Sequence, residues 1–375
     1  MCKTTNSSNN LTNSMNMDEI IEQNRIAEIF RFDNLERFKS NYSLTDSFML
    51  NDDRFAAFGE IFKNKPSLLC IAAYYNAIKI GEYLFQNGAS PTTGDAFFRS
   101  PIHFAGAGGS LAFIRLLESH NADINAYDNR QRTYIHYAAE YDRVEILKYA
   151  YISGANLDEK SVDGCPIHLA CKTGSFLSIE FLTKTKKCDL NRSVRDRPPI
   201  LHLLNASCFE AIPLLLHYGM NIDNLIVGNW TTLYYVIRTG SSHVVQMLLD
   251  FGADPNGCCG RKGWAPMHVA AQEHNMKIVD ILYNKGGIIH CLTESSQSPF
   301  SLALSPSQFE KGDLQYQTAK RIKTYEVDFF ARSLILTLAL KKLHPRFDEV
   351  VAQSVKKSEA EKASKRYQQP FDFNL

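Results

Sequence analysis

The sequence predicts an all-α protein built as a solenoid, in which a helix–turn–helix repeat recurs along most of the chain. The first observation is the period: aligned on His268, the repeats fall at Cys70, His103, His136, His168, His202, Tyr234, His268 and Ser301, with gaps of 33, 33, 32, 34, 32, 34 and 33 residues. The second is a short apolar helix pattern after each aligned turn, and the third is a glycine after the second helix of most repeats. Such a period indicates a stacked array, because one repeat cannot bury its own apolar faces.

Each recurring position has a local physical reason. Pro266 can start a helix because its missing N–H would have no partner in the first turn. Ala270 and Ala271 let neighbouring helices approach closely, and Leu282 helps to bury the second helix. The residue after that helix needs a left-handed conformation, which glycine adopts without strain. These residues are Gly88, Gly154, Gly219, Gly252 and Gly286, with Asn121 as the substitute. The connector between repeats is expected to fold as a hairpin finger.

These motifs resemble the ankyrin-repeat family. The likeness is carried by SPIHFA at 100–105, CPIHLA at 165–170 and APMHVAA at 265–271, together with the repeat endings NADIN at 121–125, GANLD at 154–158 and GADPN at 252–256. It covers residues 65–304. The resemblance implies an α-solenoid of about seven to eight repeats. It also implies a non-catalytic protein–protein interaction scaffold that binds partner proteins through its fingers and concave groove.

We expect helical caps at both ends of the array. Residues 1–17 are rich in Asn, Ser and Thr and should be a disordered tail. Residues 18–64 should form a helical N-terminal cap with a degenerate repeat, residues 65–304 the array, and residues 305–375 a helical C-terminal cap and tail. Around 183–200 one repeat lacks its glycine and the next contains Pro198, Pro199 and Pro213. Local irregularity is therefore expected there, either as a joint or as sequence drift.

Residues 328–343 are apolar on nearly all sides and too short to span a membrane. They either pack against the open end of the array or dock a partner. Docking would support an alternative function, in which the chain is a regulatory or targeting adaptor subunit of an enzyme complex. A phosphatase, a kinase or a ubiquitin ligase would then bind through this helix.

The composition favours a soluble cytoplasmic protein, with the nucleus also compatible. The chain has 375 residues and a formal net charge of +1, so it exerts no long-range attraction on nucleic acid. Its nine cysteines are scattered, several within apolar helical positions, as expected for reduced thiols. No leader-like pattern opens the chain, and no apolar run approaches the roughly 18 residues of a membrane span.

No set of residues indicates catalysis, a metal or a cofactor. The recurring histidines would lie roughly 10 Å apart, whereas zinc ligands lie about 2 Å from one ion. The family resemblance implies that they brace the turns by hydrogen bonding. Cys258 and Cys259, with His290 and Cys291 one repeat later, match no strong metal or redox motif. We therefore expect no enzyme activity, no cofactor and no small-molecule substrate.

A basic cluster comprises Lys184, Lys186, Lys187, Arg192, Arg195 and Arg197. It is either a solvated surface or a contact for an acidic protein partner. No aromatic ladder accompanies it, which argues against nucleic acid.

Both tryptophans of the chain, Trp230 and Trp264, hold the same repeat position, two residues before the Thr or Pro that opens the first helix. Arg99 and Arg132 hold it in earlier repeats. The resemblance implies that this position lies on the finger and faces the groove, and Trp and Arg dominate binding hot spots. The groove side of the first helices adds Glu140, Tyr141, Lys172, Arg238, Gln272 and Glu273. The alternative for either tryptophan is packing on a neighbouring finger.

Overall fold

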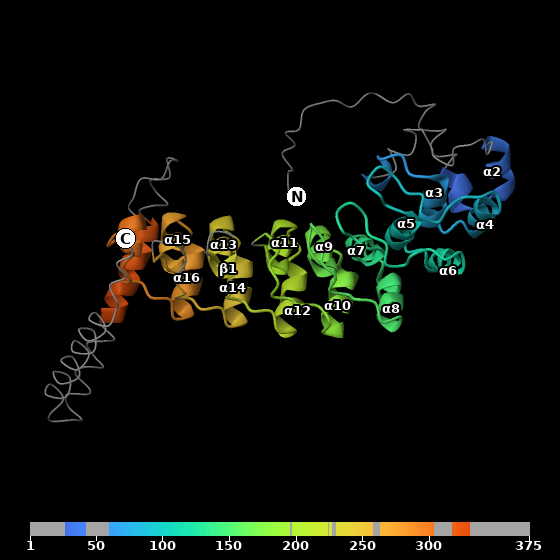
Figure 1. Cartoon of the computed structure of the whole chain (residues 1–375). Coiled ribbons are helices and arrows are strands. Elements are labelled where there is room, and N and C mark those ends of the chain that lie inside the picture. Colours follow the sequence, from blue (N-terminus) through green and yellow to red (C-terminus); the bar gives the residue numbers. More distant parts are fainter. Residues whose placement is uncertain are drawn as a thin grey trace, which may run out of the picture. The chain divides into compact units, whose positions relative to one another are not determined.

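The computed structural model describes residues 27–42, 60–195, 197–223, 225–226, 230–257, 263–303 and 317–330. The chain divides into two compact units, Met1–Thr232 (unit 1) and Leu233–Leu375 (unit 2). Each unit is a stack of helix pairs, which confirms the predicted all-α repeat architecture (Figure 1). The described strands are β1 (Leu225–Ile226) and β2 (Trp230–Thr231), an antiparallel pair in which Ile226 lies opposite Trp230.

In unit 1 the first helices of successive repeats pack side by side, and so do the second helices (Figure 1). The first helices are α3 (Leu68–Tyr75), α5 (Pro101–Gly108), α7 (Tyr134–Glu140), α9 (Pro166–Thr173) and α11 (Pro199–Asn205). The second helices are α4 (Ile78–Gln86), α6 (Leu111–Ser119), α8 (Val144–Ile152), α10 (Phe176–Thr185), and η3 (Phe209–Ala211) continued by α12 (Ile212–His217). Small buried residues such as Ala105 and Ala138 allow this close packing.

A turn residue of one repeat caps the second helix of the next repeat. Asn76, in the left-handed conformation at φ 59°, accepts a hydrogen bond from the Phe113 N–H at 3.1 Å. Asp142, at φ 57°, accepts one from Ser178 N–H at 2.7 Å. Because the first N–H groups of a helix lack internal partners, these side chains satisfy donors that the repeat itself leaves open.

The segment before the array is built in the same way. Helical residues 27–31 and α2 (Leu35–Asn41) pair around the buried rings of Phe30 and Phe38, which contact edge to face at 5.6 Å. Asp33 lies in the turn between them at φ 48° and accepts hydrogen bonds from Lys79 N–H and Ile80 N–H at the start of α4. This helix pair therefore caps α4 as the turns of later repeats cap α6 and α10.

The region around 183–200 is irregular but packed. The helix α10 ends without glycine, and Lys186 takes the left-handed conformation at φ 53°. In the next repeat a 3-10 turn precedes the short helix α12, which has Pro213 in its first turn. Contacts of α9 with α11 and of α10 with α12 run across this region. The stack of unit 1 is therefore continuous here.

Unit 2 contains α13 (Thr232–Thr239, which starts at the unit boundary), α14 (Ser242–Asp250), α15 (Pro266–Gln272), α16 (Met276–Asn284) and α17 (Pro299–Ala303). Helical residues 317–330 pack on α16, where Tyr325 stacks on Tyr283 at 3.9 Å and donates a hydrogen bond to Asp280 at 2.7 Å. Only residues 328–330 of the predicted 328–343 helix are among those described. None of the described helices is long and apolar enough to cross a membrane.

The recurring histidine joins its own helix to the next finger. In His136 one ring nitrogen, Nδ1, accepts from the Thr133 N–H at 3.1 Å, and the other, Nε2, lies 3.1 Å from the Glu159 carbonyl. His103, His168 and His268 make equivalent contacts. Burial, followed by the charge of Arg132, lowers the pKa of His136 to about 4, so the ring is neutral at pH 7. A neutral ring can accept at one nitrogen and donate at the other, which is the geometry of a brace.

Candidate functional site

A hollow in unit 1 brings together the predicted residues Arg99, Arg132, Glu140, Tyr141 and Lys172. It has a volume of about 520 Å³ and is completed by Ile61, Asn64, Phe97, Asp128, Asn129, Arg130 and Tyr137. Its walls are two successive fingers and the ends of α7 and α9. We call it the finger–helix groove.

Arg132 lines this groove and is almost fully buried, at 6% exposure. Its guanidinium donates to Asp163 on the next finger, at 2.8 Å through Nε, and to Glu140 at the end of α7, at 3.0 Å. Its backbone N–H donates to Asp128 at 2.8 Å. Arg132 therefore ties two fingers to a helix end, and its charge is neutralised within the protein.

Arg99, one repeat earlier, is also buried and paired, but its partners are Asp95 of its own finger and the Ile61 carbonyl. It is 7% exposed, donates from Nε to Asp95 at 2.7 Å and from its terminal nitrogen to the Ile61 carbonyl at 2.8 Å. Its guanidinium lies 5.3 Å from the centre of the Phe104 ring, a cation–π contact. Sequence reasoning overlooked Asp95, four positions before Arg99, which would have indicated that this arginine is paired internally. The partners of the Arg132 guanidinium, Asp163 and Glu140, have no such local signal.

A partner cannot reach the buried guanidinium groups of Arg99 and Arg132, but other side chains of the groove are accessible. Lys172 in the last turn of α9 is exposed, and Tyr141 at the end of α7 is half-buried. Burial, followed by the charge of Glu140, raises the pKa of Tyr141 to about 12, so it remains a neutral donor. Phe97 is 43% exposed, and Arg130 is 54% exposed with an ion pair to Asp163 at 3.1 Å. Sequence reasoning did not select Phe97 or Arg130, although the Phe97–Phe98 pair in a polar finger was a visible signal.

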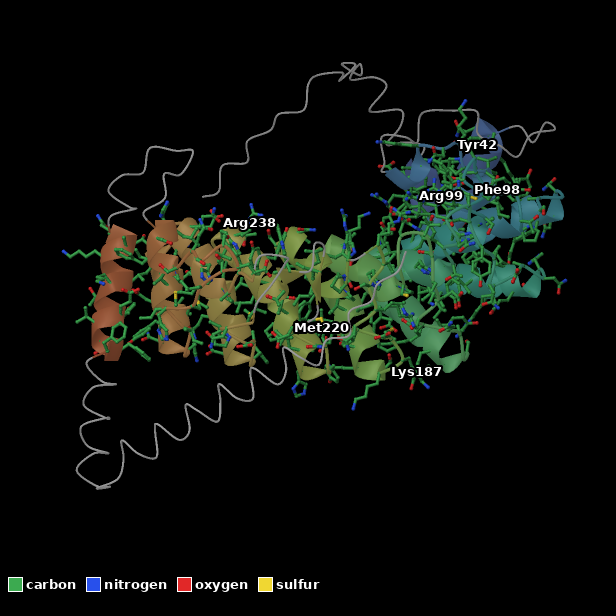
Figure 2. All side chains as sticks on the ribbon, turned by 60° about the vertical axis from the view of Figure 1, so that its left-hand side comes forward. Tyr42, Phe98, Arg99, Lys187, Met220 and Arg238 are labelled. Atoms are coloured by element: carbon green, nitrogen blue, oxygen red, sulfur yellow. The ribbon has the colours of Figure 1, made fainter. Side chains whose placement is uncertain are left out.

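In unit 2 the predicted residues Arg238 and Glu273 lie near each other at the ends of α13 and α15, and Gln272 is the last residue of α15. Arg238 Nε is 3.8 Å from a Glu273 carboxylate oxygen, and both side chains are largely accessible. Figure 2 shows Arg238 at the surface of this unit and Arg99 among the side chains of unit 1.

The two tryptophans differ in their surroundings and belong to different units. Trp230 is half-buried in the β2 strand of unit 1. Trp264, in unit 2, is half-buried near His268, with 6.2 Å between ring centres. Its indole Nε1 is buried, and no described residue accepts a hydrogen bond from it. Their common row on one groove stays a prediction.

The remaining predicted clusters are either paired or outside the described residues. In the basic cluster, Arg192 pairs with Asp158, and Lys184 pairs with Glu180 at 2.6 Å, whereas Lys187 lies exposed at the edge of unit 1 (Figure 2). Residues 258–262, including Cys258 and Cys259, lie outside the described residues. Among the described residues no group of His, Cys, Asp and Glu is arranged to hold a metal ion.

Comparison with known proteins agrees with the repeat architecture. A family model described as ankyrin repeats (3 copies) matches residues 69–161 and 201–293. The chain is 29% identical over 222 residues to ankyrin repeat protein nuc-2 of Neurospora crassa, which covers 58% of this chain and 21% of that protein. It is 27% identical over 210 residues to NF-kappa-B inhibitor alpha of Gallus gallus, which covers 56% of this chain and 58% of that protein. The chain thus spans less than two thirds of both relatives.

A solved structure supports the fold alone. The ankyrin repeat domain of Bcl-3, described as a member of the IkappaB protein family, has a TM-score of 0.51 and 22% sequence identity. It covers 59% of this chain and 96% of that domain.

Proposed function

This chain is an ankyrin-repeat protein, and from that premise we propose that it is a non-catalytic scaffold that binds partner proteins through its fingers and grooves. Ankyrin repeats are protein-interaction modules, so the family itself supports the scaffold role. The finer assignment concerns the surface. We assign the finger–helix groove of unit 1 as one contact surface, with Lys172, Tyr141, Phe97 and Arg130 as the groups that touch the partner.

The single observation that carries this assignment is that buried, paired arginines form the base of the groove while its rim, the edge formed by Lys172, Tyr141, Phe97 and Arg130, is accessible to solvent. Arg132 fixes its own finger and the next one to the end of α7, and Arg99 fixes the preceding finger to Ile61. The rim then offers an aromatic ring, a phenol and an exposed ammonium group to a partner, and the paired arginines lower the cost of ordering the fingers on binding. Interface hot spots are enriched in aromatic residues and arginine.

The test is affinity purification from native extract with quantitative mass spectrometry. A full-length Lys172→Glu, Phe97→Ser double variant should lose a partner that the wild type recovers, because charge and ring are both removed from the rim. The matched control is Lys148→Glu, which makes the same charge change on α8, where Lys148 pairs with Glu145. If every partner is recovered equally by the groove variant, the groove assignment is wrong.

The tryptophan positions form a second part of the proposal. Replacing Trp230 and Trp264 together by Ala should reduce recovery of a protein partner while the helical content by circular dichroism stays unchanged. We further propose protein rather than nucleic acid as the partner class, since the net charge is +1, and the cytoplasm as the compartment.

The alternative is an adaptor subunit that docks an enzyme through its C-terminal helix. One observation favours it: Val327 and Phe330, on a helix whose Tyr325 packs on α16, are 59% and 63% exposed. Deleting residues 324–375 distinguishes the two roles of this helix. Loss of solubility identifies a cap, whereas a folded array that no longer recovers an enzyme identifies a docking element.

A further inference from the structure

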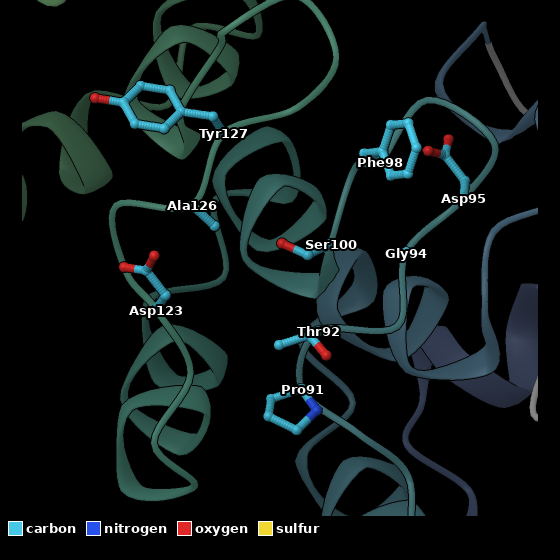
Figure 3. A pocket seen from close by; sticks show the side chains of 9 residues that line it. All are labelled: Pro91, Thr92, Gly94, Asp95, Phe98, Ser100, Asp123, Ala126 and Tyr127. Carbon is cyan, nitrogen blue, oxygen red and sulfur yellow. The ribbon is translucent and has the colours of Figure 1, made fainter.

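Two hollows share one finger of unit 1, and their charged residues differ. Phe97 lines the finger–helix groove, whereas the next residue, Phe98, lines a smaller hollow of about 190 Å³ (Figure 3). The charged residues of the smaller hollow are the carboxylates Asp95 and Asp123, with neither Lys nor Arg in its described lining. The groove contains both signs of charge, and the state of each charged group indicates the kind of partner that it fits.

Both carboxylates of the described groove lining already have partners within the protein. Asp128 is 6% exposed and accepts a hydrogen bond from the Tyr137 hydroxyl at 2.7 Å. It also accepts hydrogen bonds from the backbone N–H groups of Arg130 and Arg132, each at 2.8 Å. Glu140 forms an ion pair with the Arg132 guanidinium at 3.0 Å, and its side chain is 19% exposed. The groove therefore offers little negative charge to a cation on a partner.

The arginines of the groove are engaged as well, whereas its lysine is not. Arg99, Arg130 and Arg132 each form an ion pair with a carboxylate of a finger or a helix end. Lys172 is exposed in the last turn of α9, and no described residue forms a hydrogen bond or an ion pair with its ammonium group. Among the described groove residues, Lys172 therefore supplies the positive charge that stays available to a partner.

Tyr141 adds a hydrogen-bond donor near this charge. The Thr173 hydroxyl donates to the Glu140 carbonyl at 3.0 Å and so joins the ends of α9 and α7. Tyr141 and Lys172 are the sequence neighbours of these two residues, and both line the groove. The Tyr141 hydroxyl has no hydrogen bond to a described residue, and its raised pKa keeps it protonated at neutral pH. A neutral hydroxyl can donate a hydrogen bond to an anion.

We propose that the finger–helix groove binds an acidic segment of a partner protein, with an Asp or Glu carboxylate of that segment paired to the Lys172 ammonium group. The Tyr141 hydroxyl donates a hydrogen bond to the same segment, and an apolar residue of the segment packs on the Phe97 ring, which is 43% exposed. This assignment rests on the proposed protein-binding function and adds the chemistry of the partner.

A carboxylate fits this site better than a phosphate group. Guanidinium groups match phosphate through two parallel N–H bonds, whereas a lysine acts as a point charge. The guanidinium groups of Arg99 and Arg132 are buried and paired, so the site presents one accessible ammonium group instead. A phosphorylated side chain carries a charge of about −1.5 to −2, of which one ammonium group balances only part.

The test is a selection on the full chain from a displayed library of random unstructured peptides, followed by fluorescence anisotropy of the selected peptides. These peptides should share a required Asp or Glu, and replacing it by the matching amide should weaken Kd about fivefold. Lys172→Gln should weaken the Kd of the original peptide by a similar factor. Since both changes remove the same pair, combining them should weaken Kd little further.

Two further measurements test the charge and the hydroxyl separately. Raising the salt concentration should weaken binding to the wild type more than binding to Lys172→Gln, because salt screens an exposed ion pair. Tyr141→Phe should weaken Kd about threefold, since it removes one hydroxyl donor and keeps the ring.

Controls separate the groove from other surfaces and from folding. Lys148→Gln removes an exposed lysine charge on α8, and Asp123→Asn removes a charge from the smaller hollow, so both should leave Kd unchanged. Tyr151→Phe, at an exposed tyrosine of α8, is the matched control for Tyr141→Phe. Lys172→Gln and Tyr141→Phe should keep the wild-type midpoint of thermal unfolding, because neither altered group has a hydrogen bond to a described residue.

Three outcomes overturn the proposal: selected peptides that need no acidic residue, equal binding to wild type and Lys172→Gln, or no enrichment over a parallel selection on Lys172→Gln. Peptides that lose affinity with Phe97→Ser but need neither Lys172 nor an acidic residue would keep the groove as a contact surface and remove the acidic partner. Peptides that bind the Lys172→Glu, Phe97→Ser double variant as tightly as the wild type would remove both. The two proposals can therefore fail separately.

Discussion

Arg132 in unit 1 and Trp264 in unit 2 hold the same position of the repeat, yet they differ in burial and in whether their polar groups are hydrogen-bonded. Arg132 is almost fully buried, and each of its three guanidinium nitrogens donates a hydrogen bond to Asp163 or Glu140. Trp264 is half-buried with an indole N–H that no described residue accepts. The repeat position alone therefore does not decide whether a residue holds the fold or is available for binding. The neighbouring fingers and helix ends decide it.

The largest expected effect comes from removing the buried arginine. Arg132→Ala leaves Glu140 without its cation and Asp163 with only the exposed Arg130, and breaking a buried ion pair costs about 3 kcal/mol or more. Urea denaturation of the full chain should show a clearly lower unfolding midpoint. Arg130→Ala is the matched control, because Arg130 is 54% exposed and its pair with Asp163 should contribute less than about 1 kcal/mol. Equal midpoints for both variants would contradict the assigned role of Arg132 as a clamp.

The next effect concerns the histidine that braces the same finger. The folded-state pKa of His136 is about 4, below the unfolded value of about 6.5, so on acidification the unfolded state binds a proton first. The stability that His136 contributes is present near pH 7 and is lost as the pH falls from about 6.5 towards 4. We expect a loss of about 2 kcal/mol between pH 7 and pH 5 from this residue.

The pH-dependent stability that His136 contributes can be measured as a difference between the wild type and a variant without this histidine. The unfolding free energy of wild type and of His136→Gln is determined at both pH values, since other buried histidines titrate in both proteins. The variant should show the smaller loss on acidification. A pH dependence that the substitution leaves unchanged would mean that His136 is protonated in the folded state as well.

A smaller effect tests the tryptophan side of the comparison. Trp264→Phe keeps an apolar ring and removes a buried N–H without an acceptor among the described residues, so stability should stay equal or rise by up to about 1 kcal/mol. The midpoint of thermal unfolding measures this. A drop of several degrees would show that the indole N–H has a partner and that Trp264, like Arg132, holds the fold.

The smallest effect is expected for the exposed pair of unit 2. Arg238 and Glu273 are 3.8 Å apart with side chains 49% and 41% exposed, so Arg238→Ala should change the unfolding free energy by less than about 0.5 kcal/mol. Urea titration of the variant beside wild type is the measurement. A larger loss would place Arg238 among the structural residues instead of the binding candidates.

Much of the fold could be predicted because its signals are local. A proline that starts a helix, a glycine that ends one and an alanine pair between them are each explained within one repeat. The N-terminal helix pair was harder to predict, since its turn motif is absent. Its link to the array is one carboxylate, Asp33, which caps a helix that begins 45 residues later in the chain. The repeat period does not predict a contact between two residues that lie so far apart in the sequence and outside the repeat motif.

Part of the groove lining was predictable from the sequence, but the roles of its residues were not. The sequence pointed to Arg99, Arg132, Glu140, Tyr141 and Lys172, and the structure places all of them around one hollow. It did not reveal that the arginines are internally paired, nor that Phe98 projects into solvent from a left-handed backbone.

By itself, therefore, the sequence determined the repeat, its helix boundaries and the family, because these depend on residues close together in the chain. Only the tertiary structure decided which charges are neutralised and which remain available. Arg132 contacts Glu140 at the end of α7 and Asp163 on the next finger, and the strength of each ion pair depends on the distance between the two charges. Such distances are set by how one repeat stacks on the next. The same stacking leaves Lys172 and Phe98 facing solvent.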